Sequence, residues 1–484
     1  MKYTKTLVAF ALLCGMFSSA SAKTWFIGPL RTYTAPSKVM SLVANGDTVL
    51  IDAGTYSGDV GEWTRNNLVI RAAGGRAHLD ANGKIAQSKG IWVVSGNNTY
   101  IEGIEFSGAT ISAALGNNGA GIRQQGNNLT LRNCFFHDNQ DGILGGGDTT
   151  SDVDFEACEF ASNGAGDGYS HNIYITHVHS FTLKFCYVHE AKVGHNVKSR
   201  AWNNYILYNR IIDAETGTAS YDIDLPNGGR SIILGNSIMK GPLAQNHQLI
   251  RYGEEGLTNP DSELFVINNT LLTELGSTTF IAVAPGAAPA KVINNLFAGA
   301  GAMVAGSADT LTNVHSTDTS YFHFKDVRQH DYHLTPLSPT LLGTASLGAT
   351  KGFGLAPVQQ YEHPLDSSVR AEVIPSIGAY KSATGAEVAS AVAKVTEVMN
   401  YPNPFCKAAV IQLPMADRTA WTSMDRLDAY DAAGRLVQSR LVNTLSGLVV
   451  FERGALASGI YYYSLHNAHN LYRGRLVISS DAQK

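Results

Sequence analysis

One short pattern recurs eight times between residues 97 and 297, at intervals of 24 to 32 residues. Each copy alternates apolar and polar residues, which is typical of a short strand with one buried face. A strand that recurs in this way predicts a solenoid, in which each coil buries its apolar face against its neighbours. The copies are NNTYIEGIEF (97–106), NNLTLRNCFF (127–136), SDVDFEACEF (151–160), HSFTLKFCYV (179–188), NNYILYNRII (203–212), RSIILGNSIM (230–239), SELFVINNTL (262–271) and AKVINNLF (290–297).

Two columns within the repeat favour an all-β fold, a right-handed parallel β-helix. The copies are aligned on Ile101, Leu131, Phe155, Leu183, Leu207, Leu234, Val266 and Val292. Two positions later, Asn133, Asn209, Asn236, Asn268 and Asn294 predict a ladder of stacked amides at a tight turn. Five positions after the aligned residue, an apolar stack consists of Phe106, Phe136, Phe160, Val188, Ile212, Met239, Leu271 and Phe297.

Three cysteines lie two residues before the apolar stack and so share its inward face: Cys134, Cys158 and Cys186. In successive coils their thiols would lie about 4.8 Å apart. A disulfide or a metal site is conceivable at this spacing. We favour inert thiols in a dry core, because buried cysteine behaves as a small apolar residue.

Residues 24–380 resemble the pectate-lyase-like superfamily of right-handed parallel β-helices. GDTVLIDAGTY (46–56) is similar to the opening coil of those proteins, and DYHLTPLSPTLLG (331–343) with IGAY (377–380) is similar to their closing segment. The resemblance implies a β-helix domain over residues 23–380. It implies architecture more strongly than chemistry.

The N-terminal segment, residues 1–22, reads as a signal peptide. Lys2 and Lys5 precede an apolar stretch, and Ala20-Ser21-Ala22 is a small-residue cleavage site. No later stretch approaches the roughly 18 to 20 apolar residues of a membrane helix. The formal net charge of −4 argues against nonspecific nucleic-acid binding. We therefore expect an exported monomer with no nucleic-acid partner.

The C-terminal region has a different pattern. Residues 381–398 are Ala-rich and read as a linker, and residues 399–484 alternate apolar and polar residues with Gly at turns, as a small antiparallel β-sandwich does. Four segments resemble the C-terminal sorting domain of the type IX (Por) secretion system: YPNPF (401–405), LDAYDAAGRLVQS (427–439), GLVVFERGALASGIYYYSL (447–465) and YRGRLVIS (472–479). The resemblance implies the secretion machinery as a partner, and a secreted, extracellular or outer-membrane-associated location. A carbohydrate-binding sandwich is the alternative.

A second strand in each coil places a row of residues on the outer surface. An inward apolar residue in each strand is followed by an outward residue, and these outward residues are Trp92, Arg123, Leu144, Tyr174, Lys198, Asp224, Arg251 and Ala282. Because adjacent coils lie about 4.8 Å apart, Tyr174, Lys198, Asp224 and Arg251 would form one continuous polar stripe.

This stripe carries the groups that cleavage of a uronic-acid polymer requires. β-Elimination needs a cation on the sugar carboxylate, a base for the adjacent proton and an acid for the leaving oxygen. The catalytic candidates are Lys198, Tyr174, Arg251, Arg200, His195 and His171, the substrate-binding candidates are Arg123, Trp92, Tyr252 and Tyr221, and Asp222 and Asp224 could bind Ca²⁺.

NVKSRAWNNYILYNRI (196–211) resembles the chondroitinase B and alginate lyase family. The resemblance implies that Lys198 is the base. The family's arginine in the next coil has no counterpart in YDIDLPNGG (221–229), so Arg251 one coil later would have to replace it. We therefore expect a protein that acts on an acidic polysaccharide, with a polysaccharide lyase as the candidate enzyme.

Other interpretations stay open. An inverting glycoside hydrolase would use paired carboxylates such as Asp222 and Asp224, and a non-catalytic glycan-binding adhesin would use the same sheet face. Lys198 beside Asp224 could be a solvated ion pair. His171 and His195 could cap turns by hydrogen bonding.

Overall fold

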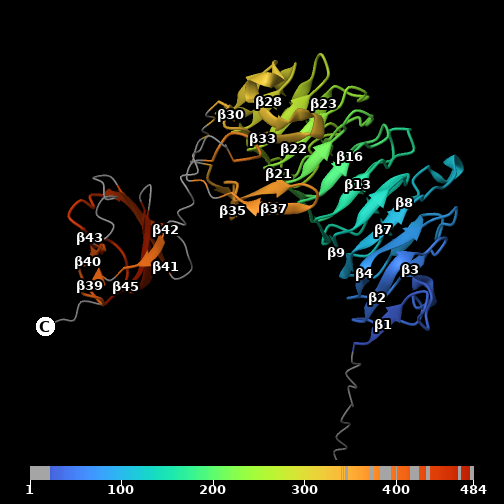
Figure 1. Cartoon of the computed structure of the whole chain (residues 1–484), viewed down its shortest axis with the longest axis horizontal. Helices are drawn as coiled ribbons and strands as arrows, with labels where there is room; N and C mark the ends of the chain where they lie inside the picture. The colour runs from blue at the N-terminus through green and yellow to red at the C-terminus, as the bar shows by residue number, and fades with distance from the viewer. Residues whose placement is uncertain are drawn as a thin grey trace, which may run out of the picture. The chain divides into compact units, whose positions relative to one another are not determined.

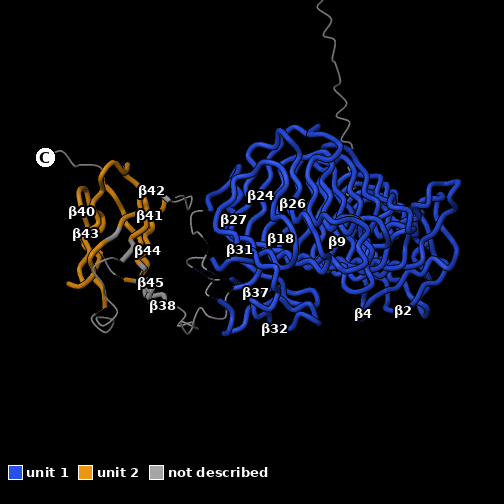
Figure 2. Tube along the Cα trace, turned by 90° about the horizontal axis from the view of Figure 1, so that it is seen from above, with its two compact units in different colours: residues 1–384 blue, residues 385–484 orange. Residues whose placement is uncertain are grey.

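The structure is a computed structural model that describes residues 22–339, 341, 343, 347–370, 372, 375–381, 394–398, 400–414, 425–431, 436–466 and 470–479. The chain forms two compact units, residues 1–384 and 385–484, shown in different colours in Figure 2. The predicted signal peptide, apart from residue 22, lies outside the described residues, as does most of the predicted linker.

The first unit is a parallel β-helix, which confirms the predicted fold (Figure 1). One face is a sheet to which each coil contributes a strand, in the order of the chain, and every pairing in it is parallel. Its strands are β3 (Gly61–Trp63), β5 (Gly90–Val94), β8 (Ala120–Gln124), β11 (Asp141–Gly145), β14 (Ile173–Ile175), β17 (Val197–Ser199), β20 (Ile223–Leu225), β23 (Gln248–Tyr252), β26 (Thr279–Val283) and β29 (Ala302–Ala305).

The other faces are two columns of strands joined through the long strand β4 (Val69–Asp80). The first column adds β1 (Thr24–Ile27), β2 (Thr48–Thr55), β6 (Thr99–Glu102), β9 (Leu129–Arg132), β12 (Asp152–Glu156), β15 (Ser180–Lys184), β18 (Asn203–Leu207), β21 (Arg230–Leu234), β24 (Leu264–Ile267), β27 (Ala290–Ile293) and β30 (Asp309–Leu311). The second adds β7 (Ile104–Ser107), β10 (Phe135–His137), β13 (Glu159–Ala161), β16 (Tyr187–His189), β19 (Arg210–Ile212), β22 (Ser237–Lys240), β25 (Thr270–Thr273), β28 (Leu296–Ala298) and β31 (Val314–Ser316). Helical turns among the described residues are the 3-10 helices η1 (Pro36–Lys38), η2 (Ala113–Leu115), η3 (Thr319–Phe322) and η4 (Val327–Gln329).

A continuous stack of side chains, which we call the turn ladder, lies at the turn between these two columns. Each member after Cys134 accepts a hydrogen bond from the backbone N–H of the member one coil before it, from 3.5 Å for Cys134 N to Cys158 Sγ to 2.8 Å for Asn209 N to Asn236 Oδ1. The cysteines are free thiols and have no exposed surface. The members are Cys134, Cys158, Cys186, Asn209, Asn236, Asn269, Asn295 and Asn313.

The turn ladder corrects the predicted asparagine column. Asn133, Asn268 and Asn294 lie one residue before the ladder position and adopt positive φ angles of 48°, 52° and 57°. They turn the backbone, which asparagine tolerates, while the next residue supplies the stacked side chain. Thiols and amides therefore share the turn ladder, while Asn294 Nδ2 still donates to Asn268 Oδ1 at 3.3 Å in the predicted column.

The predicted alignment slips by one residue in two coils. Leu183 pairs with Ile206 and not with Leu207, so Ile211 and Ile238 lie in the apolar stack where Ile212 and Met239 were expected. Ile212 and Met239 face the other way and are nevertheless fully buried. These strands are apolar on both faces, so the alternation that should fix the register is absent.

Residues 319–380 bury those outer faces. They form β32 (Phe324–Asp326), β33 (Asp331–Leu334), β34 (Ala349–Thr350), β35 (Phe353–Gly354), β36 (Gln359–Glu362) and β37 (Asp366–Val369), and the orange segment lies along the green and yellow coils in Figure 1. Phe322 and Tyr332 pack with Ile212 and Met239, and a second cluster joins Leu355 to the coils. The last coil differs, since β30 is exposed along its length and β29 and β31 are only partly covered.

The second unit consists of two small sheets around one apolar core that includes Phe451, Tyr463 and Tyr472. One sheet contains β38 (Lys394–Glu397), β45 (Asn470–Ile478), β44 (Gly459–His466), β41 (Asp425–Asp431) and β42 (Leu436–Val442), and the other β39 (Asn400–Tyr401), β40 (Ala408–Gln412) and β43 (Leu448–Glu452). The pairings are antiparallel except between β38 and β45. Within the described residues, no helix is long and apolar enough to cross a membrane.

The turn ladder predicts a specific cost for the loss of one amide. Asn236 Oδ1 accepts bonds from the Asn209 backbone and side chain, and its Nδ2 donates to Ile206 O and Asn269 Oδ1. Asn236→Ala leaves several buried polar groups unpaired, so we expect urea denaturation to show roughly 3 kcal/mol less stability. Cys158→Ala in the same column removes one long N–H to sulfur bond and should cost about half as much. Equal losses would contradict the role of the amides.

Candidate functional site

The predicted polar stripe exists on the outer face of the ten-stranded sheet. Tyr174 in β14 pairs with Lys198 in β17, Lys198 pairs with Asp224 in β20, and Asp224 pairs with Arg251 in β23. Four successive coils therefore bring these side chains together. Arg123 in β8 is two strands from Tyr174, with Leu144 between them.

Lys198 and Asp224 form the centre of this arrangement. Lys198 Nζ lies 3.6 Å from Asp224 Oδ2, and the Asp224 side chain is only 4% exposed. Asp224 Oδ1 is buried and has no hydrogen-bond partner among the described residues. Burial raises the pKa of Asp224 to about 6, although the charge of Lys198 opposes the shift. One oxygen of Asp224 thus lies near the Lys198 amine, while the other is buried.

Arg200 is fixed by three neighbours. Its Nε donates to Tyr174 Oη at 3.0 Å and its Nη1 to Asn227 Oδ1 at 2.5 Å. Two further bonds of 2.6 and 2.9 Å hold the two carboxylate oxygens of Glu255. Burial opposes the charge of Arg200, but the bonds to Glu255 and Tyr174 raise its pKa. The pairing is the planar, two-bond geometry by which arginine recognises carboxylates.

Glu255 also lies near Lys198, with 3.9 Å between Glu255 Oε1 and Lys198 Nζ. The Arg200 hydrogen bond lowers the pKa of Glu255, so this carboxyl group is ionised at neutral pH. We call Tyr174, Lys198, Arg200, Asp224 and Glu255 the Lys198 cluster. It contains two cations and two carboxyl groups around one phenol.

His171 and His195 lie behind the cluster as a stacked pair. Their ring centroids are 4.6 Å apart, and both side chains are buried. His171 Nδ1 accepts the His195 N–H at 2.9 Å, and His195 Nδ1 accepts the Tyr221 N–H at 3.3 Å. Burial, then Lys198 and Lys240, lowers the pKa of His195 to about 3, and burial also lowers the pKa of His171.

The backbone bonds leave the protons of these neutral rings on Nε2. His195 Nε2 lies 3.4 Å from Asp224 Oδ2. His195 therefore lies against Asp224, and the two histidine rings stack coil on coil. Tyr221 continues the stack, with its ring centroid 4.9 Å from that of His195.

Arg251 does not join the Lys198 cluster. It pairs with Glu254, three residues later in the turn that follows β23. The contacts of Arg251 therefore do not support the prediction that it replaces the arginine missing from the next coil. The arginine beside Lys198 is Arg200.

Two predicted aromatic contact residues are wrong. Trp92 pairs with Ile122, not with Arg123, and so lies in the inward row, where it has no exposed surface and stacks edge-on against Trp63 and Phe106. Tyr252 is also fully buried, and its hydroxyl donates to Gly229 O at 2.8 Å. Neither ring can contact a sugar at the surface.

The predicted use of Asp222 as a calcium ligand is also wrong. Asp222 is fully buried at the turn before β20, where Asn196 Nδ2 donates to it at 3.1 Å. Lys240 Nζ lies 3.3 Å from Asp222 and 3.5 Å from Asp213, and all three side chains have no exposure. The carboxylates of Asp222 and Asp224 therefore face different partners and cannot share an ion.

Sequence reasoning missed Glu255 and Asn227. Neither belongs to the repeating strands, because Asn227 follows β20 and Glu255 follows β23 in the loops PNGG (226–229) and GEEG (253–256). Two consecutive glutamates directly after a strand of the polar stripe were the available signal.

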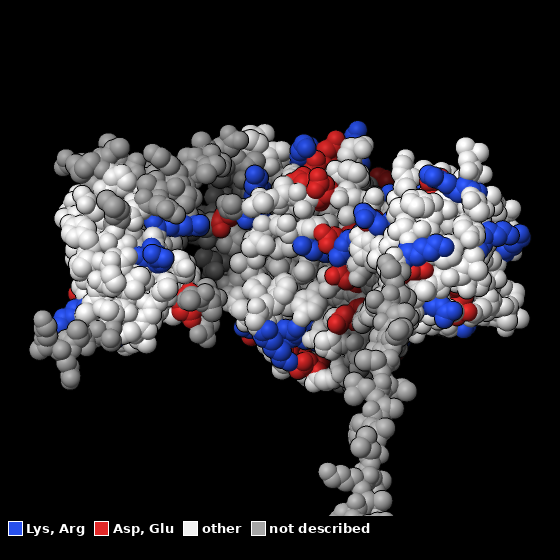
Figure 3. Space-filling view, turned by 90° about the horizontal axis from the view of Figure 1, so that it is seen from below, with Lys and Arg blue, Asp and Glu red and all other residues white. Residues whose placement is uncertain are grey.

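Charged side chains of both signs are mixed on one face of the described residues. On the face seen in Figure 3, Lys and Arg lie interspersed with Asp and Glu.

Comparisons with known proteins identify the second unit. Residues 399–479 match the family described as the secretion system C-terminal sorting domain. The predicted sorting domain is confirmed, and the chain is a secreted β-helix protein. No curated protein matches the sequence. Among solved structures, the crystal structure of pectate lyase Pel9A is similar with a TM-score of 0.48 and 15% identity, over 75% of this chain and 97% of that chain.

The burial of Asp224 predicts a pH-dependent effect on stability. Its pKa is raised from 3.8 to about 6 in the folded chain, so its contribution to stability is fully present below about pH 4 and is lost as the pH rises through 6. Asp224→Asn should therefore stabilise the protein more at pH 8 than at pH 4, by on the order of 3 kcal/mol for a shift of about two units. Urea denaturation at both pH values measures this difference. Exposed Asp309→Asn is the control, and a pH-independent effect of Asp224→Asn would contradict the burial argument.

Proposed function

We propose that the Lys198 cluster binds the carboxylate of a uronic-acid polysaccharide and that the protein cleaves this polymer by β-elimination outside the cell. The observation that carries the proposal is the carboxylate of Glu255, which Arg200 holds with two hydrogen bonds while Lys198 Nζ lies 3.9 Å away. A sugar carboxylate has the same two oxygens. A site shaped to hold one carboxylate in this way can hold another.

Glu255 is suited to be replaced by such a ligand. Its side chain is 46% exposed and lies in the turn after β23, whereas the Arg200 side chain is 15% exposed and fixed by Tyr174 and Asn227. The cation is therefore preorganised, and the internal carboxylate is the mobile partner in the exchange.

The remaining groups match the other requirements of elimination. With the carboxylate on Arg200, the neutral amine of Lys198 takes the proton from the adjacent sugar carbon, and the Tyr174 hydroxyl protonates the departing glycosidic oxygen. A general base acts in its unprotonated form, so the rate should increase toward alkaline pH.

Only one of the two predicted calcium ligands, Asp224, remains a candidate. Asp222 faces Lys240 in the core, so a calcium ion at this surface would have to bind through Asp224 and the substrate. Assays with and without Ca²⁺ test that requirement.

The base is tested with the full chain and with alginate, pectate, chondroitin and hyaluronan as substrates. We expect one of them to yield unsaturated uronates, followed by their ultraviolet absorbance. Lys198→Ala should lower the rate by at least about a hundredfold, and Lys198→Arg should not restore it, because guanidinium stays protonated. Lys184→Ala, on another face, is the control.

Several outcomes would reject the elimination mechanism. These are the absence of product from every polymer, and an undiminished rate in Lys198→Ala. Reducing ends without unsaturation would indicate hydrolysis, and binding without cleavage would indicate a glycan-binding protein.

The exchange of carboxylates makes a second prediction. Glu255→Gln keeps the size of the side chain but removes its charge, so the polymer no longer competes with an internal anion. We expect KM to fall by about three- to tenfold, which corresponds to roughly 1 kcal/mol. Glu254→Gln, its neighbour on Arg251, is the matched control. An unchanged or higher KM in Glu255→Gln would exclude Arg200 as the carboxylate site.

A further inference from the structure

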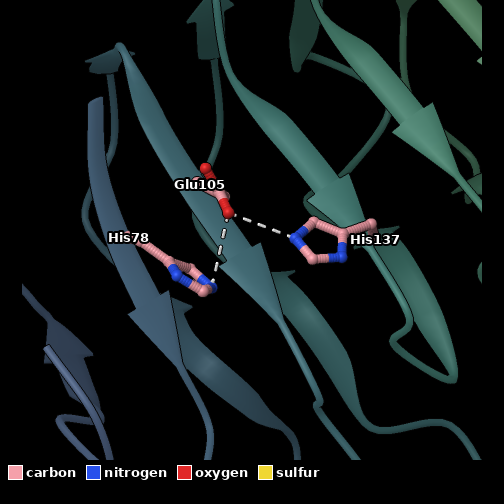
Figure 4. A group of neighbouring side chains, drawn as sticks. All are labelled: His78, Glu105 and His137. Carbon is pink, nitrogen blue, oxygen red and sulfur yellow. Dashed lines mark hydrogen bonds and ion pairs between the residues drawn. The ribbon is translucent and has the colours of Figure 1, made fainter. Parts of the chain in front are cut away.

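A second group of ionisable side chains lies on a different face of the β-helix, in its N-terminal coils. His78 in β4, Glu105 in β7 and His137 in β10 come from three successive coils and point toward one another (Figure 4). All three are partly exposed, with side-chain exposures of 26%, 22% and 23%. We call them the His78 cluster. None of its members belongs to the Lys198 cluster.

The distances within the His78 cluster are those of a metal site. Glu105 Oε1 lies 3.5 Å from His78 Nε2 and 3.2 Å from His137 Nε2, and the three ligand atoms all lie within 4.8 Å of one another. A tetrahedral ion with bonds of 2.0–2.2 Å separates its ligand atoms by about 3.3–3.6 Å. The two separations from Glu105 are close to this range.

The surroundings of His137 prepare its ring for a metal ion. His137 Nδ1 lies 3.0 Å from Asp138 Oδ2, and Lys192 Nζ pairs with the other oxygen of Asp138 at 3.1 Å. A carboxylate that accepts the Nδ1 proton fixes the tautomer and leaves Nε2 as the donor atom, as in many zinc sites. His137 Nε2 in turn faces Glu105 Oε1 at 3.2 Å.

His189 shows what the same geometry looks like without a second histidine. Two coils later in the same column, His189 Nε2 lies 3.3 Å from Glu159 and Nδ1 lies 2.9 Å from Glu190. The residue that pairs with Glu159 on the preceding strand is Phe135, where Glu105 has His78. Burial opposes the charge, but the bonds to Glu159 and Glu190 raise the pKa of His189.

We propose that His78 Nε2, Glu105 Oε1 and His137 Nε2 bind one divalent first-row transition-metal ion of the zinc class. Two imidazoles and one carboxylate are a ligand set that zinc accepts, and three protein ligands leave a fourth position for water or a ligand. The ion links three successive coils. Ser107 Oγ, now 2.7 Å from His78 Nε2, donates to another acceptor when the metal is bound.

The test uses the full chain after treatment with a chelator and dialysis. Titration with ZnCl2, followed by calorimetry and metal analysis, should give one tightly bound ion per chain and an increase in Tm. Co²⁺ in its place should give the visible absorption of a four-coordinate site.

Matched variants locate the ion. His137→Ala and Glu105→Gln should abolish the tight binding and the increase in Tm, Asp138→Asn should weaken binding by about 10- to 100-fold, and His189→Ala should bind as the unaltered chain does. Absence of uptake, uptake that survives His137→Ala and Glu105→Gln, or equal loss in His189→Ala would each overturn the proposal. Glu105→Gln preserves shape, so it decides the question even if His137→Ala fails to fold.

Discussion

The coils that contain β10 to β31 are positioned by the hydrogen bonds of the turn ladder. At that turn a backbone N–H is buried in each coil, and a buried N–H without a partner costs on the order of 1–3 kcal/mol. The ladder supplies the acceptor from the next coil, with a thiol in the first coils and an amide afterwards. Since a slip of one residue would turn each strand over, this fixed contact also sets which residues of the ten-stranded sheet face outward.

The architecture could be predicted from the repeat. The period and the inward cysteines recur over several coils, so an error in the register of one strand does not change the predicted fold. The errors arose where alternation fails. GIWVV (90–94) is apolar throughout, so the sequence could not distinguish Ile91 from Trp92 as the residue equivalent to Ile122. The later coils are apolar on both faces because residues 319–380 cover them, and coverage by a distant segment leaves no local periodicity. Asn268 turns the backbone with a positive φ angle, and Asn269 belongs to the turn ladder. Because both residues are asparagine, the sequence does not show which of them has which role.

The candidate site was predictable as far as it lies on strands. The register of Tyr174, Lys198 and Asp224 followed from flanking apolar residues, whereas Glu255 and Asn227 come from loops whose paths no repeat defines. The misplacement of Asp222 has the same origin. It lies at a turn, where the alternation of a strand no longer states which way a side chain points, and its partner Lys240 is in the next coil. In the candidate site, Lys198 and Arg200 therefore pair with one buried carboxyl group, Asp224, and one exposed carboxyl group, Glu255.

The two ends of the β-helix are buried to different extents, and this difference affects how the β-helix unfolds. In a solenoid each coil is stabilised by its immediate neighbours, so opening starts at an end and proceeds coil by coil. The first coils are closed by Trp25, Val39 and Val43 within the main core, whereas β30 in the last coil is exposed along its length. Fraying therefore begins at the last coil, and amide hydrogen exchange should be fastest there. The Lys198 cluster lies in the interior coils, far from that loose end in the order of opening.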